Sequence, residues 1–278
     1  MCITLILASC SQQEGTTAAI EGAEGLLFNF MPNSPPARIT VGSAGDTFSI
    51  AVQARNGGSF SKDRSVEGKL FLGGYDRNIV EIADSSQVIE TKFLEKRDAV
   101  NPKGGLDLFE FEGKINAQNL LAESYNFNLL ATACYSYETK AGPSVCIDPR
   151  PYETGVEKAC AVGPISLNSQ GAPIAITNIE EEVLAEEIQF RIIIKNVGGG
   201  RAIKKGTADD CNPFDNKVDL RQNIDFVYLK EWPKIGGDVL ACRPSNEDKS
   251  IRLIEGEGFI ICKWPKPDAM KEKDYGLK

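Results

Sequence analysis

The sequence predicts an all-β protein built from two tandem β-sandwich domains, and three observations support this fold class. Apolar and polar residues alternate along most of the 278-residue chain, a period of two that is typical of half-buried strands. No long stretch repeats apolar residues at the helical spacing of three and four. One strand-and-turn pattern occurs twice, 140 residues apart, which indicates an internal repeat about one domain in length.

The first copy contains seven predicted strands, separated by turn signals rich in glycine, proline and asparagine. Their residue ranges are 25–31, 46–56, 67–73, 78–83, 106–115, 125–137 and 143–148. Seven short strands with such turns are the signature of an immunoglobulin-like sandwich. The best helical candidate, at 116–124, is one or two turns long. Tyr125 enters the penultimate strand, where a tyrosine of such sandwiches often folds its hydroxyl group back onto the preceding loop.

The second copy repeats the central strand of the first. When Asn56 is superposed on Asn196, the apolar positions coincide: Phe48, Ile50, Val52 and Ala54 match Ile188, Phe190, Ile192 and Ile194. Residues 259–262 line up with residues 109–112 of the late strand. After residue 262 only 16 residues follow, whereas the first copy continues into a predicted hairpin at 125–148. We therefore expect the second sandwich to lack its final hairpin.

A sandwich without those strands exposes unpaired edges and half of its core. Two explanations remain open, namely a longer protein clipped at its C-terminal end or a partner strand that completes the sandwich by β-augmentation. The second domain is then expected to melt separately from the first. The acidic run at 180–182 belongs to this copy, and we expect it on an exposed turn between the first two strands.

The chain therefore divides into four parts. Residues 1–23 form a signal-like segment and tether, and residues 24–150 form the first sandwich. Residues 151–171 are a linker rich in proline and glycine, and residues 172–278 form the second, incomplete sandwich.

The N-terminal segment indicates export. Leu7-Ala8-Ser9-Cys10 resembles the lipobox of prokaryotic lipoproteins, and that resemblance implies a lipid on Cys10 and a flexible tether after it. The apolar stretch is short and lacks the cationic start of a secretory signal. Either the true start lies upstream or the four-residue match is accidental, which leaves secretion without an anchor, or a cytosolic protein with an apolar N-terminal strand, as alternatives.

The cysteines favour an oxidising compartment. Apart from Cys2 and Cys10, six remain, and an even set at wide spacing is what disulfides need: Cys134, Cys146, Cys160, Cys211, Cys242 and Cys262. In the predicted hairpin 125–148, Cys134 and Cys146 point to the same face at cross-strand distance, so we expect this pair. Its main rival is Cys146 with Cys160. Cys242 and Cys262 are expected to cross-link the second domain, which leaves Cys160 and Cys211 least certain.

Composition excludes several classes of function. The chain has no histidine, which removes Ser-His-Asp and Cys-His catalysis and histidine-ligated metals. Its net charge of −8 argues against binding to nucleic acid. We predict no catalytic, cofactor-binding or metal-binding residues, and contact with a membrane only through the lipid anchor.

Two segments carry a family resemblance. DTFSIAVQARNGGS, at 46–59, and EIQFRIIIKNVGGG, at 187–200, resemble the second strand and following turn of CARDB-type domains, which are immunoglobulin-like repeats of prokaryotic cell-surface proteins. The resemblance covers most of 24–148 and, less fully, 172–262. It implies an exported, non-enzymatic protein with a structural or adhesive role, whose partners are other surface proteins or glycans.

Two alternatives stay open. The chain could be a subunit of an extracellular assembly, self-associating by strand complementation through the second domain. It could also be a carbohydrate-binding accessory protein, for which Trp232 and Trp264 are the stacking candidates.

Overall fold

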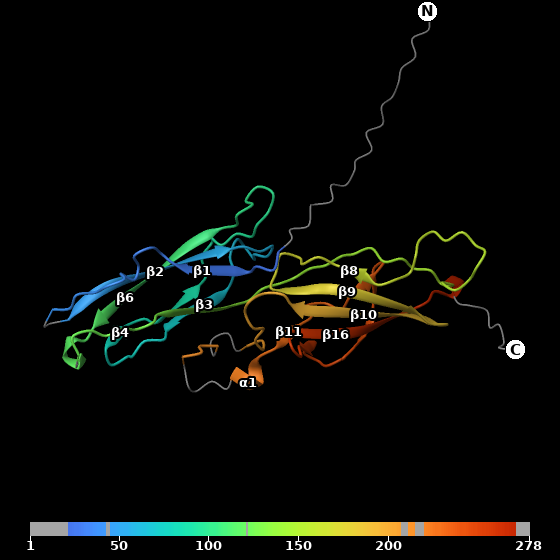
Figure 1. The fold of residues 1–278 in the computed structure, drawn as a ribbon. Helices are drawn as coiled ribbons and strands as arrows, with labels where there is room; N and C mark the ends of the chain where they lie inside the picture. The colour runs from blue at the N-terminus through green and yellow to red at the C-terminus, as the bar shows by residue number, and fades with distance from the viewer. Residues whose placement is uncertain (1–21, 43–44, 121, 207–210, 215–219, 271–278) are drawn as a thin grey trace, which may run out of the picture.

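The computed structural model describes residues 22–42, 45–120, 122–206, 211–214 and 220–270. The protein is all-β, as predicted, and its sheets are antiparallel. Figure 1 shows two sheet assemblies placed end to end, with β1 to β7 in one and β8 to β16 in the other. Helical structure among these residues is limited to three short segments: η1 (Ala117–Asn119), α1 (Leu220–Asn223) and η2 (Asp268–Met270).

The first sandwich packs a four-stranded sheet against a three-stranded sheet. The larger sheet has the order β1 (Leu26–Phe30), β2 (Asp46–Asn56), β6 (Leu106–Ile115) and β4 (Val80–Ile82). The smaller sheet has the order β5 (Ser86–Ile89), β3 (Gly68–Gly73) and β7 (Leu130–Tyr135). Alternation dictates the core, because Ile50 and Val52 of β2 face Leu70 and Leu72 of β3 with almost no exposure.

The second sandwich has one large sheet and two small ones. The large sheet has the order β14 (Ala241–Arg243), β16 (Glu257–Pro265), β10 (Glu187–Asn196), β9 (Ile174–Val183) and β8 (Ile165–Ser166). The small sheets pair β11 (Phe226–Tyr228) with β15 (Ser250–Arg252), and β12 (Lys234–Ile235) with β13 (Asp238–Val239). The four apolar residues of β10 predicted to face inward all belong to this second core.

The two large sheets share their central pairing but not the predicted late-strand alignment. Val52 of β2 pairs with Phe109 of β6, and the repeat-related Ile192 of β10 pairs with Ile260 of β16. Phe109 therefore corresponds to Ile260, one residue beyond the match expected from sequence. Because side chains alternate between faces, that shift turns Phe259 outward, where it is 46% exposed.

The predicted strand at 143–148 does not form, and this changes the account of the second sandwich. After β7 the chain does not turn back on the first sandwich but continues along the second, as the yellow-green trace between β7 and β8 shows (Figure 1). Val145 and Ile147 are partly buried against the second core. We call residues 139–149 the covering segment, because they place apolar side chains on a core that was expected to be half exposed.

Candidate functional site: the junction between the sandwiches

The repeated asparagine explains how each central strand ends. In the first copy, Asn56 Nδ2 donates to the Phe60 carbonyl at 2.7 Å, and Gly58 N–H donates to Asn56 Oδ1 at 3.1 Å. In the second copy, Asn196 makes the corresponding bonds with Gly200 and Gly198, at 2.8 and 3.2 Å. An asparagine side chain that binds its own downstream backbone closes a turn. The motif is therefore a structural one. Both turns lie at the junction, because Ser59 N–H donates to the Gly171 carbonyl and Gly198 N–H donates to the Pro173 carbonyl.

Asn56 makes two further bonds that Asn196 lacks among the described contacts. Its Nδ2 also donates to the Leu94 carbonyl at 3.0 Å, and Tyr137 Oη donates to its Oδ1 at 3.2 Å. Asn56 is fully buried, whereas Asn196 is only partly buried. Burial also raises the pKa of Tyr137 to about 12, so its hydroxyl stays a donor at all physiological pH values.

The first turn docks directly onto the chain that leads into the second sandwich. Ser59 N–H donates to the Gly171 carbonyl at 2.7 Å, and Ser59 Oγ donates to the Gln170 carbonyl at 2.6 Å. A Cβ atom at Gly58 would lie 2.6 Å from the Gly171 oxygen. Glycine is required at this position because the two backbones approach so closely.

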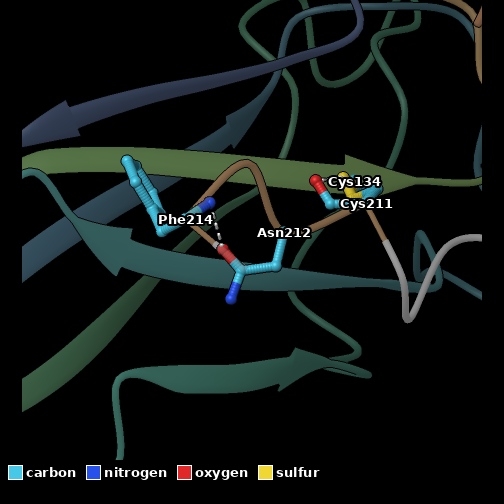
Figure 2. The surroundings of a disulfide bond; sticks show 4 residues. All are labelled: Cys134, Cys211, Asn212 and Phe214. Carbon is cyan, nitrogen blue, oxygen red and sulfur yellow. Dashed lines mark hydrogen bonds between the residues drawn. A yellow bond between two sulfur atoms is a disulfide. The ribbon is translucent and has the colours of Figure 1, made fainter. Parts of the chain in front are cut away.

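A disulfide joins the two sandwiches covalently. Cys134 of β7 is bonded to Cys211, which lies between β10 and α1 in the second half of the chain, with 6.4 Å between their Cα atoms. Figure 2 shows Phe214 beside the same strands, with its N–H bonded to Asn212 Oδ1 at 3.0 Å. The Phe214 ring lies where a side chain at Gly73 of β3 would project. The second half of the chain thus covers the outer face of the smaller sheet of the first.

The covering segment is fixed to the second sandwich at both ends. At its start, Thr139 Oγ1 donates to the Ile174 carbonyl at 2.5 Å, and the preceding Glu138 pairs with Lys230 at 2.7 Å. The Lys230 bond lowers the pKa of Glu138. At its end, Lys266 Nζ donates to the Pro149 carbonyl at 3.2 Å.

The structure replaces the first predicted disulfide with another. Cys134 does not pair with Cys146, because the chain crosses to the second sandwich instead of returning along β7. Cys146 pairs with Cys160, the rival arrangement, with 5.8 Å between their Cα atoms. The Cys242 pair with Cys262 agrees with expectation and links neighbouring positions of β14 and β16.

Other candidate residues lie away from the junction. Cys10 lies outside the described residues. Tyr125 does not fold back as predicted, since its ring is 41% exposed and stacks on Phe127. Trp232 and Trp264 both pack, partly buried, against the second core.

The described residues offer two further observations about site chemistry. They contain no helix long and apolar enough to span a bilayer. They also hold no group of three or more acidic, cysteine or histidine side chains placed to bind a metal ion.

Comparison of the chain with protein-family models, with curated proteins and with solved structures finds no match.

Proposed function

We propose that this chain is a non-enzymatic protein exported to the cell surface, where two immunoglobulin-like domains of the CARDB type act as a stiff spacer or adhesive unit. The observation that carries this proposal is the Cys134–Cys211 disulfide, which we call the junction disulfide. It ties one sandwich to the other at a point where their backbones are already hydrogen-bonded. Two domains joined in this way behave as one rod, because rotation about the linker would break several contacts together.

The disulfides also support the compartment that we propose. Three disulfides join all six cysteines of the two sandwiches, and this is compatible with an extracellular protein. We propose that Cys10 carries a lipid and that the following residues tether the rod to the membrane. Mass spectrometry of the native N-terminus tests the anchor. A lipidated cysteine at position 10 is expected, and an unmodified mature N-terminus at any other residue would contradict it.

Small-angle scattering tests the rod. We compare the oxidised chain with the double variant Cys134→Ser/Cys211→Ser, and use Cys146→Ser/Cys160→Ser as the matched control. The control removes a bond of equal chemistry that joins the covering segment only to residues shortly after it. The junction variant should show a broader distribution of interatomic distances, and the control should match the wild type. Identical scattering from wild type and junction variant would refute the spacer proposal.

A second candidate is a subunit of an extracellular assembly. It is favoured by β7, which among the described strands pairs only with β3 and so offers its other edge to an added strand. The second sandwich is less suited to this role than expected, because the covering segment occupies its core. Sedimentation at rising concentration separates the candidates, since only the assembly subunit should form larger species.

A further inference from the structure

The sequence predicts that the acidic run at 180–182 lies on an exposed turn. This prediction is wrong, because the run lies within β9. Strand pairing sets the direction of each side chain. Glu181 pairs with the inward-facing Phe190 of β10 and lies in phase with the buried Ile179. The carboxylate of Glu181 therefore points toward the second core, whereas its neighbour Glu182 is exposed on the other face.

Glu181 faces the covering segment, and its carboxylate has no cation or hydrogen-bond donor as its partner among the described residues. Its Oε1 atom is buried and has no hydrogen-bond partner. The negative charge of Asp148, in the covering segment, opposes ionisation of Glu181. Lys158 Nζ forms a salt bridge with Asp148 Oδ2 at 2.9 Å, and the backbone N–H of Arg150 donates to the same carboxylate. A partly buried carboxylate beside a like charge is more stable when it holds a proton.

Four other charged groups at this end of the sandwich, Lys266, Asp238, Arg191 and Glu180, have partners of their own. Lys266 donates to the Pro149 carbonyl, and Asp238 accepts the indole N–H of Trp264 at 3.3 Å. On the outer face of the sheet, Arg191 of β10 pairs with Glu180 at 3.2 Å. Among the described groups, none of these cations is bonded to Glu181.

We propose that Glu181 makes the covering segment a pH-sensitive latch, which is closed over the second core while this carboxyl group is protonated and opens more often once it is ionised. A protonated Glu181 is neutral, so the closed state then buries no unpaired charge. An ionised Glu181 has a buried, unpaired carboxylate oxygen and is opposed by the negative charge of Asp148, and opening exposes that oxygen to water.

The direction of the pH dependence follows from linkage. Burial first, and Asp148 second, raise the pKa of Glu181 from 4.5 to about 7 in the closed state. In the open state the solvated side chain returns toward its ordinary pKa. The closed state therefore binds the proton more tightly, and opening increases as pH rises from about 4.5 to about 7. Above that range both states are ionised, and the equilibrium levels off.

Native-state proteolysis measures the opening. A protease of broad specificity cleaves residues 139–149 only when they leave the sandwich, and each rate is divided by that of the free peptide at the same pH. For the wild type we expect the normalised rate to rise about tenfold from pH 5 to pH 7, less than the full pKa difference allows because Glu181 keeps some solvent contact. Glu181→Gln should give a low rate with no pH dependence. Glu182→Gln, one residue away and exposed, should behave as the wild type.

Asp148→Asn provides an independent check that does not alter β9. Removing this like charge should lower the closed-state pKa of Glu181, so that opening levels off at a lower pH and rises by a smaller factor, while the dependence on Glu181 remains. A wild-type rate that is flat between pH 5 and pH 7 would overturn the proposal. So would a Glu181→Gln variant that keeps the wild-type pH dependence.

Discussion

Replacing Asn56 with alanine should cost far more stability than the same change at its repeat partner, Asn196. Asn56 is fully buried and makes four hydrogen bonds, to the Phe60 and Leu94 carbonyls, Gly58 N–H and Tyr137 Oη. Each bond contributes about 1 kcal/mol net, and the partners left behind are desolvated. We expect Asn56→Ala to lower the free energy of unfolding by about 3–4 kcal/mol.

Asn196→Ala serves as the matched control. It removes two bonds from a partly exposed site where water can replace them, so we expect a loss of about 1 kcal/mol. Urea unfolding of the oxidised full chain, followed by circular dichroism, measures both variants at unchanged denaturant slope. Equal losses in the two variants, or a loss below about 1 kcal/mol for Asn56→Ala, would refute the view that the buried network makes this turn the stronger one.

Two further substitutions, each with a matched control, test the contacts between the halves. Gly73→Ala places a methyl group in the ring of Phe214, so it should displace that ring and speed reduction of the junction disulfide by a thiol. Gly142→Ala meets no atom within 4 Å and should leave the rate unchanged. Ile147→Ala removes apolar contact from the second core and should cost about 1–2 kcal/mol in urea unfolding. Val156→Ala, at a 48% exposed site, should cost almost nothing, and an equal loss would contradict the role of the covering segment.

The central strands could be predicted from sequence because local pattern and tertiary environment agree there. The alternating pattern predicts the observed bounds of β2 (46–56) and of β6 (106–115), since one face of each strand is apolar and the other polar. The same pattern at 143–148 was misleading. Alternation shows that a segment has an apolar side but not which core receives it, and here Val145 and Ile147 pack against the second core rather than the first.

The junction and the position of Glu181 had no comparable signal. Pairing of Cys134 with Cys211 depends on a loop of the second half reaching the first sandwich, which no local spacing records. Along β9, the pairing with β10 shifts register between Ile193 and Ile194. That irregularity breaks the period of two across the strand and hides the inward direction of Glu181 within an acidic run. The aligned aromatic residues Phe109 and Phe259 misled for a related reason, since an error of one residue reverses the face.

Calorimetry of the oxidised monomer tests the central claim most directly. If the covering segment completes the second core and the junction disulfide couples it to the first, the two sandwiches should unfold together. The account predicts one cooperative transition, with a calorimetric enthalpy equal to the van't Hoff enthalpy. Two separated transitions, with the second sandwich melting at the lower temperature, would contradict it.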